Sequence, residues 1–286
     1  MAHLAAAKIN LSLAVTGRRA DDYHMLESLV AFADIGDTLS VEPAPQNRLQ
    51  IDGPFAAQIS DTPQEDNLVM RTLAALEAHI GRALPSSIRL NKNLPVASGM
   101  GGGSADAAAA LQALCVCHEV SLAADELAQI GSGLGADVPV CLASEPAWMT
   151  GIGHQVTRLA PLPAADIVLV NPLQPLPTGP VFAAANIAPA DENTPPRNAP
   201  PRFENLAALG AWLAAEGNDL QAAAISLMPE IADCLAALQQ DDVVHCAMSG
   251  SGASCFALCA PGKGGDLAAR YAQQRPDDWV QAGRLL

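Results

Sequence analysis

Aromatic and basic residues are scarce in this chain. Trp, Tyr and Phe make up 3% of the sequence, whereas hydrophobic residues as a whole make up 50%. Buried cores must therefore be built from Ala, Leu, Val and Ile. Lys and Arg number 15 against 30 Asp and Glu, which leaves a net charge of −15 at pH 7. Because nucleic acids and anionic membranes bind clustered positive charge, we expect neither as a partner.

Several other signatures are missing. No stretch has the roughly 18 consecutive apolar residues of a membrane span. Lys8 and Asn10 interrupt the apolar N-terminal segment, so we also expect no signal peptide. The 7 cysteines show neither zinc nor thioredoxin spacing, and the 6 histidines show no HExxH pattern. We therefore expect reduced cysteines, no metal site built from protein ligands, and a cytoplasmic location.

A glycine-rich loop at residues 95–104 is the most informative segment. Glycine allows a positive φ and lets a ligand approach the backbone N–H groups closely. Small helix formers follow from about Ser104, and the first N–H groups of such a helix are unpaired, at the positive end of its dipole. These features predict an anion site, and we expect phosphate. The glycines concerned are Gly99, Gly101, Gly102 and Gly103.

Two common phosphate motifs do not fit this loop. A P-loop needs a lysine directly after its glycines, and none follows here. In a dinucleotide fingerprint, Ser104 would replace the last glycine, and no strand–loop–helix unit with a ribose-binding acid follows. A dinucleotide-dependent oxidoreductase is therefore disfavoured. A flexible loop before an Ala-rich helix remains the alternative to a phosphate site.

The rest of the chain mixes helix and strand patterns, which predicts an α+β fold. Residues 7–15 alternate between polar and apolar side chains, as in a strand with one polar and one buried face. Asp66 and Asn67 precede a predicted helix at 68–80. Half of the 22 prolines lie between Pro161 and Pro201, and residues 188–201 are predicted to form a mobile loop. Further helices are expected at 104–118, 123–131, 205–215 and 219–239, and strands at 38–41, 48–51, 87–90, 167–170, 243–248 and 255–258.

Five segments, in order along the chain, carry a family resemblance. They are Ala7-Lys8-Ile9-Asn10-Leu11, residues 17–26 with Tyr23-His24, Gly36-Asp37-Thr38, the glycine-rich loop, and Gly135-Ala136-Asp137-Val138-Pro139; a tight glycine turn at 248–254 accompanies them. Together they resemble the GHMP kinase superfamily over nearly the whole chain. The lysine-containing strand and the Tyr-His segment are similar to the branch that phosphorylates 4-diphosphocytidyl-2-C-methyl-D-erythritol. The glycine loop by itself marks only the superfamily.

The resemblance implies a two-domain fold and a kinase reaction. Residues 1–155 are expected to form a nucleotide-binding domain of the ribosomal protein S5 domain 2-like type, and residues 156–286 a ferredoxin-like domain. The γ-phosphoryl group of ATP is expected to pass to the 2-hydroxyl of the acceptor, a step of the non-mevalonate pathway to isoprenoid precursors. We expect Mg²⁺ to arrive with the nucleotide, without a dedicated protein cage, and the chain to be a monomer or weak homodimer.

Phosphoryl transfer needs a phosphate cradle, help in removing the hydroxyl proton, and positive charge. The resemblance implies that Asp137 accepts the proton as general base. It implies that Lys8 is its partner, which stabilises the incipient alkoxide and keeps the aspartate ionised. Taken singly, Asp137 fits a turn before Val138 and Pro139, and Lys8 fits an exposed strand position. Their joint occurrence within the family pattern favours the catalytic interpretation.

The resemblance also assigns binding residues. Tyr23 and Phe182 are expected to stack on the cytosine, with His24 bonded to its edge; a core role is the alternative for Phe182. Asn10 is expected to contact the methylerythritol end, and Thr178 another part of the substrate. The expected nucleotide-binding residues are Pro95, Val96, Ala97, Ser98, Gly99, Met100, Gly101, Gly102, Gly103, Ser104 and Asn67, the last with a helix N-cap as an equally good alternative.

Three positions depart from the family pattern. Ala105 stands where a second serine is usual, Asp22 replaces a glycine, and Val30 stands where some members carry a substrate-facing aromatic residue. Two rival functions remain. A homoserine or mevalonate kinase is disfavoured by Tyr23-His24, because those substrates carry no cytosine. A catalytically inactive GHMP-fold binding protein is disfavoured because both Lys8 and Asp137 are present.

Overall fold

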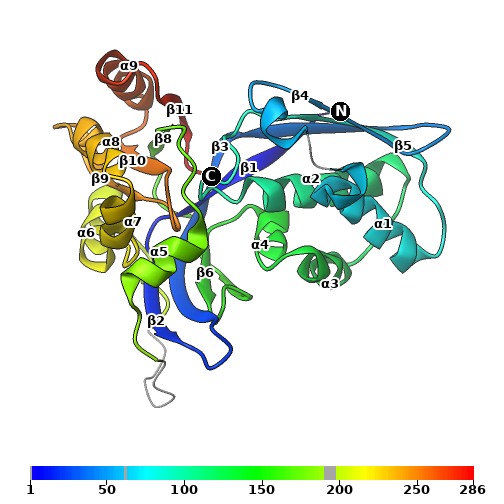
Figure 1. Cartoon of the computed structure of the whole chain (residues 1–286), viewed down its shortest axis with the longest axis horizontal. Coiled ribbons are helices and arrows are strands. Elements are labelled where there is room, and N and C mark those ends of the chain that lie inside the picture. Colours follow the sequence, from blue (N-terminus) through cyan, green and yellow to red (C-terminus); the bar gives the residue numbers. More distant parts are fainter. Residues whose placement is uncertain (1, 61–62, 190–197) are drawn as a thin grey trace. The chain divides into compact units, whose positions relative to one another are not determined.

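The computed structural model describes residues 2–60, 63–189 and 198–286 (Figure 1). They form two compact units. Unit 1 comprises the described residues of Met1–Ala7, Gly36–Val96 and Gly101–Ser144, and unit 2 those of Lys8–Ile35, Ala97–Met100 and Glu145–Leu286. Strands β1 (His3–Asn10) and β3 (His24–Pro43) and the glycine-rich loop contribute to both units. A domain boundary at 155/156 stays a prediction.

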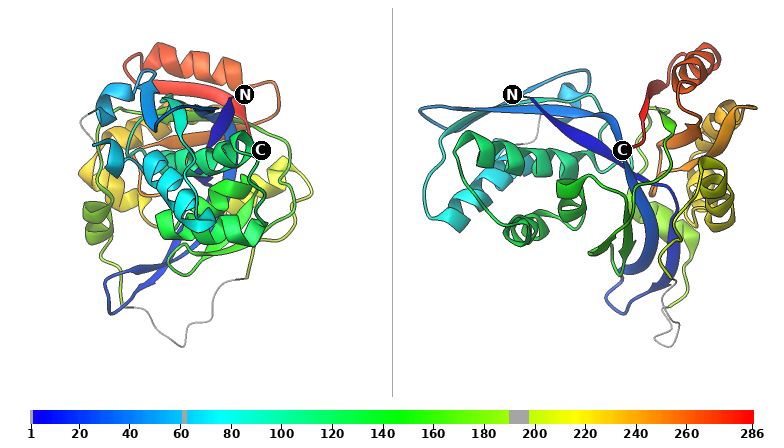
Figure 2. Two further views of the ribbon diagram at one scale, coloured as in Figure 1. Left: turned by 90° about the vertical axis from the view of Figure 1, so that its right-hand side faces the viewer. Right: turned by 180° about the vertical axis from the view of Figure 1, so that it is seen from behind.

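Unit 1 is a sheet covered by helices on one face (Figures 1 and 2). Strand β5 (Ser86–Asn91) pairs antiparallel with residues 38–43 of β3 and parallel with β4 (Arg48–Asp52). Alternate side chains such as Leu39 and Ile88 are buried and pack with apolar residues of the helices. Two short 3₁₀ turns, Ala56–Ile59 and Gln64–Asp66, precede α1. The helices are α1 (Leu68–Ile80), α2 (Gly102–Cys117), α3 (Ala124–Leu134) and α4 (Val138–Ala143).

Helix ends in unit 1 follow local rules. The Asn67 side chain accepts a hydrogen bond from Val69 N at 2.9 Å and so caps α1, which ends at Gly81 in the left-handed region. Helix α2 is buried along most of its first three turns, because alanine leaves room for close packing on every side. It begins at Gly102, two residues earlier than expected, with Gly101 as its N-cap.

Unit 2 contains the predicted ferredoxin-like arrangement. Its four-stranded sheet has the order β11-β8-β10-β9, and each pair is antiparallel. The chain runs from strand to helices to two strands, then to a helix and a last strand, which is the βαββαβ pattern. Helices α8 and α9 cover one face of the sheet (Figure 1). The elements are β8 (Asp166–Asn171), α5 (Thr178–Ala185), α6 (Leu206–Glu216), α7 (Gln221–Leu227), α8 (Glu230–Leu238), β9 (Val243–Met248), β10 (Cys255–Cys259), α9 (Gly264–Gln274) and β11 (Trp279–Arg284).

The remaining strands of unit 2 pair with the first half of β3. Strand β2 (Ala14–Arg18) pairs with β3 from His24 to Glu27, and β6 (Ala147–Thr150) pairs with it from Ser28 to Val30. Strand β7 (Gln155–Arg158) pairs antiparallel with β6. Across residues 2–60, 63–189 and 198–286, no helix has both the length and the apolar character needed to cross a bilayer.

Several expected element bounds are wrong. The strand expected at 7–15 is two strands, because Leu13 bonds to the 217–219 segment (Leu13 N to Gly217 O, 3.0 Å) and interrupts the ladder. Its polar face is also buried, with Lys8 only 5% exposed. The helix expected at 219–239 is broken before Pro229, which has no N–H to donate. Of the loop expected at 188–201, residues 190–197 lie outside the described part.

Candidate active site

Residues 98–100 of the glycine-rich loop are held by two segments of unit 2. Lys8 N donates to Met100 O at 3.0 Å, so strand β1 contacts the loop directly. From the turn between β9 and β10, Ser249 Oγ donates to Gly99 O at 3.1 Å and Ser254 N donates to Ser98 O at 3.2 Å. The loop conformation is therefore set by strands from both ends of the sequence.

Gly99 is required at its position for two reasons. Its φ is +77°, which L residues rarely adopt. A Cβ atom there would also lie 2.7 Å from Ser249 O and 2.8 Å from Gly252 O. The prediction that glycines allow a positive φ in this loop is confirmed at this residue.

Asn10 belongs to a buried polar network in unit 2. Its backbone N donates to Ser249 Oγ at 3.1 Å, and its Nδ2 donates to Ser28 Oγ at 2.7 Å. Ser28 Oγ in turn donates to Ser12 O at 2.6 Å. The network places Asn10 beside the turn that holds the glycine loop. Its expected contact with substrate stays a prediction.

In unit 1, the start of α2 forms the segment where an anion site is expected. Gly101 has a φ of 62° and precedes Gly102 and Gly103, which form the first turn with Ser104. Ala105 N already donates to Gly101 O at 2.9 Å, so the available donors are the N–H groups before it. These donors, at the positive end of the helix dipole, are suited to bind phosphate.

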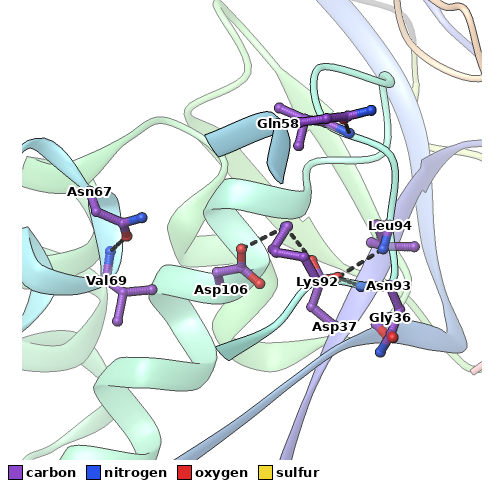
Figure 3. Close-up of polar contacts among 10 residues, drawn as sticks. Gly36, Asp37, Gln58, Asn67, Val69, Lys92, Asn93, Leu94 and Asp106 are labelled. Carbon is purple, nitrogen blue, oxygen red and sulfur yellow. Dashed lines mark hydrogen bonds and ion pairs between the residues drawn. The ribbon is translucent and has the colours of Figure 1, made fainter. Parts of the chain in front are cut away.

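A buried charge cluster lies under this helix start (Figure 3). Lys92 Nζ is paired with Asp37 Oδ2 and, at 2.8 Å, with Asp106 Oδ2 of α2. Asp37 Oδ1 accepts the backbone N–H groups of Asn93 and Leu94 at 2.6 and 2.8 Å. The cluster therefore ties together β3, the segment that enters the glycine loop, and the helix that leaves it. The sequence indicated Asp37 only as part of the Gly36-Asp37-Thr38 segment, and it did not indicate Lys92 or Asp106.

The two carboxylates share one ammonium group, which leaves the cluster short of positive charge. Among the described residues, Asp106 Oδ1 is buried with no hydrogen-bond partner. Burial raises the pKa of Asp106 to about 7, although Lys92 acts in the opposite direction. Burial lowers the pKa of Lys92, but the carboxylates of Asp106 and Asp37 outweigh it, so that pKa is raised overall.

The Asp106→Asn variant is expected to flatten the pH dependence of stability between about pH 4 and pH 7. A raised pKa means that the folded protein binds more protons than the unfolded chain in this window, so wild-type stability falls as the pH rises through it. Asn cannot titrate and removes this loss. Urea unfolding of both proteins at a series of pH values measures the difference. Parallel curves would show that Asp106 is ionised throughout.

Two of the residues expected at the cytidine end, His24 and Phe182, are in contact in unit 2. The rings of His24 and Phe182 are stacked, with centroids 4.5 Å apart and planes inclined by 30°. Partial burial, together with the nearby charge of Arg18, lowers the pKa of His24 and so favours its neutral form. Tyr23 is 61% exposed. Thr178 lies at the start of α5, with its Oγ1 2.9 Å from Ser251 Oγ.

Asp137 and Asn67 lie in unit 1. Asp137 is half-buried at the N-cap position of α4, directly before Val138 and Pro139. Asn67 caps α1, so its alternative interpretation as an N-cap is confirmed, while its contact with adenine stays a prediction.

Two family descriptions match the chain. "GHMP kinases N terminal domain" matches residues 67–145, and "GHMP kinases C terminal" matches residues 198–278. The 4-diphosphocytidyl-2-C-methyl-D-erythritol kinase of Paracoccus denitrificans is 47% identical over 285 residues, which are 98% of this chain and 95% of that protein. The enzyme of the same name from Ruegeria pomeroyi is 46% identical, covering 99% of this chain and 98% of that protein. The chain belongs to the GHMP kinases.

Solved structures agree with this assignment. A crystal structure of 4-(cytidine 5'-diphospho)-2C-methyl-D-erythritol kinase matches with a TM-score of 0.77 and 32% identity, over 100% of this chain and 99% of that one. The mevalonate kinase of Methanococcus jannaschii matches with a TM-score of 0.71 but 11% identity, and therefore shows only the shared fold. The predictions of family, two-domain fold and kinase activity are confirmed. ATP use follows from the family.

The structure shows the backbone conformation or the burial of each of the three residues that depart from the family pattern in this kinase. Asp22 adopts a φ of 65°, so the turn before Tyr23 keeps a glycine-like conformation that Asp tolerates. Val30 is completely buried and pairs with Ala147 of β6. Ala105 is buried in the first turns of α2. None of the three removes a group expected to act in catalysis.

Ser249 and Asn218 of this kinase were not predicted from the sequence. The turn at 248–254 was visible as a run of small residues, but nothing in it indicated that Ser249 bonds the glycine loop. No motif in the sequence around Asn218 indicated a role for it. Within the described ranges, no group of three His, Cys, Asp or Glu side chains is placed to hold a metal ion.

Proposed function

We propose that this kinase transfers the γ-phosphoryl group of ATP to the 2-hydroxyl of 4-diphosphocytidyl-2-C-methyl-D-erythritol, in the non-mevalonate pathway. The observation that carries the proposal is identity of 43% to 47% with kinases named for this substrate, over nearly the whole chain. The stacked pair of His24 and Phe182 supports it, because a cytosine base needs a flat apolar surface and an edge donor or acceptor.

The phosphates of ATP bind to backbone N–H groups of the glycine-rich loop. Gly101 and Gly102 present these groups at the start of α2, where the helix dipole favours an anion. The Ser104 hydroxyl is the protein oxygen that would help to hold Mg²⁺ brought by the nucleotide. When bound, the ion would offset charge on the phosphates.

Asp137 acts as the general base on the acceptor hydroxyl. It is half-buried before α4, and Pro139 restricts the backbone that follows it. Lys8 supplies positive charge from β1, where it is almost completely buried. A charge removed from water acts more strongly on a developing alkoxide than an exposed one does.

Phe182 is half-buried against the core of unit 2, and His24 stacks on its ring, so the cytosine stacks on Phe182 after the His24 ring moves aside. The 4.5 Å separation of the two rings leaves no space for a base between them. Tyr23, which is 61% exposed, is free of core packing and provides the second stacking surface. Neutral His24 bonds to the edge of the base, and Asn10 and Thr178 contact the rest of the substrate. A monomer or weak homodimer, and a cytoplasmic location, remain predictions.

The proposal is tested by coupled ADP release with three acceptors in parallel. We expect turnover with 4-diphosphocytidyl-2-C-methyl-D-erythritol and none above background with homoserine or mevalonate. Turnover with either of the other acceptors alone would overturn the choice of substrate. Absence of turnover with all three, in a protein that binds ATP, would favour the inactive binding protein.

Replacing Tyr23 with Ala is expected to raise the KM for the cytidine substrate by about 5- to 150-fold, because stacking on an aromatic ring contributes roughly 1–3 kcal/mol per base. The KM for ATP should change little, since adenine binds elsewhere. Initial rates with each substrate varied in turn measure both constants. Equal losses for ATP and the cytidine substrate, or none for either, would exclude a cytosine site at Tyr23.

A further inference from the structure

Asn218 lies in the short segment between α6 and α7, and its side-chain amide makes three hydrogen bonds. Its Nδ2 donates to Met248 O at 2.8 Å and to Gly250 O at 2.9 Å. Its Oδ1 accepts from Leu220 N at 2.9 Å. Only a primary amide can donate two hydrogens and also accept a bond in this geometry. Nothing in the function proposed above uses this residue.

The backbone around Asn218 is fixed to the strand segment that follows β1. Leu13 N donates to Gly217 O at 3.0 Å, and Asp219 N donates to Leu13 O at 2.9 Å. The Asp219 side chain adds a bond from Val15 N at 2.8 Å. Asn218 therefore projects its amide from a rigid support, and the position of that amide determines where the bound carbonyls lie.

The carbonyls that Asn218 holds belong to the turn that contacts the glycine loop. Ser249, between them, accepts from Asn10 N and donates to Gly99 O, each at 3.1 Å. Ser249 is 1% exposed. A Cβ atom at Gly250 would lie 3.2 Å from Gly99 O, so the turn and the loop are in direct backbone contact. A shift of the turn must therefore shift Gly99 or break its bond.

We propose that Asn218 is a positioning residue for the phosphate-binding loop: its two donated hydrogen bonds fix the 248–250 turn, whose Ser249 hydroxyl holds the Gly99 carbonyl. The inference rests on the proposed function of the glycine loop in binding the phosphates of ATP. The side-chain hydrogen bonds of Asn218 go to Met248, Gly250 and Leu220, outside the loop. It acts through Ser249, and misplacement of backbone donors by a fraction of an ångström weakens their bonds to a phosphate.

The test measures ATP affinity by calorimetry, beside the melting temperature, in the full-length protein. Asn218→Ala removes both donors. Asn218→Asp keeps the shape and the acceptor for Leu220 N, so it serves if the alanine variant does not fold. Each is expected to weaken ATP binding by about tenfold or more, since two backbone carbonyls lose their donor. In Asn218→Ala combined with Ser249→Ala, the two losses should be less than additive, because both act on one contact.

Asp219→Ala is the matched control. It removes a side-chain bond from the same rigid segment, to Val15 N, but none to the turn. A lower melting temperature with ATP affinity within about twofold of wild type is expected. Unchanged affinity in a folded Asn218 variant, or an equal loss in Asp219→Ala, would overturn the inference. If Gly101→Val weakens ATP binding and the Asn218 variants do not, only this inference fails; if Gly101→Val also leaves binding intact, the proposed phosphate site fails.

Discussion

Replacing Asp137 with Asn is expected to lower kcat by about 10²–10⁴-fold, the usual contribution of a general base. The amide keeps the shape of the side chain at the N-cap of α4 but cannot accept the hydroxyl proton. Affinity for ATP should be nearly unchanged, because the base acts on the acceptor and not on the phosphates. Steady-state kinetics with the cytidine substrate and calorimetry with ATP separate the two effects.

Asp125→Asn provides the matched control for that experiment. Asp125 is an exposed acid in the first turn of α3 in the same unit, so the substitution makes the same chemical change outside the proposed site. It should leave kcat unchanged and lower stability slightly, through a weaker interaction with the helix dipole. If Asp137→Asn keeps more than about a tenth of the wild-type kcat, Asp137 is only a turn residue.

The parts of the fold that were predictable depend on local chemistry. Positive φ values at Gly99 and Gly101 and the Asn67 cap follow from residue type alone. Strand β3 was recognised only at 38–41, although it extends over 20 residues. Its two halves pair with different strands, and polar residues such as Asp34 and Asp37 interrupt its apolar pattern. No short window of sequence contains the information that joins the halves.

The polar contacts of the candidate site depend on long-range pairing. Asn10 and Ser249 are 239 residues apart, and Ser249 and Gly99 are 150 apart. Lys92 is bonded to carboxylates 55 and 14 residues away. Charged and small polar residues are usually exposed, so Ser249 and Lys92 looked unremarkable in sequence, and the partners of Asn10 and Gly99 were not apparent. Their role follows only from burial and from the partners that the fold supplies.

The charge distribution clarifies how an acidic protein binds a nucleotide. With a net charge of −15, the chain repels phosphate at long range. Lys92 lies close to the start of α2, but Asp37 and Asp106 already neutralise it. The attraction that remains in unit 1 comes from backbone N–H groups and the helix dipole. Affinity for ATP should then depend on the backbone conformation of the loop more than on any single basic side chain.

Gly101→Val tests this dependence directly and is expected to weaken ATP binding by about 10²–10⁴-fold. Gly101 has a φ of 62°, which a β-branched residue adopts only at high cost, so the backbone before α2 must change. Loss of two charge-assisted hydrogen bonds, each contributing roughly 1.5–3 kcal/mol, gives this range. Calorimetry with ATP measures the affinity, and circular dichroism confirms that the variant is folded.

Gly133→Ala is the control, because Gly133 lies within α3 and a Cβ atom there would meet nothing within 4 Å. This substitution should leave ATP affinity unchanged and raise stability slightly, by about 0.4–1 kcal/mol. The contrast separates a glycine required for its conformation from one that is merely tolerated. If a folded Gly101→Val variant binds ATP as tightly as Gly133→Ala does, the phosphates do not bind at the start of α2. Binding must then depend on side chains elsewhere in the protein. Such a site is harder to form in a protein with a negative net charge.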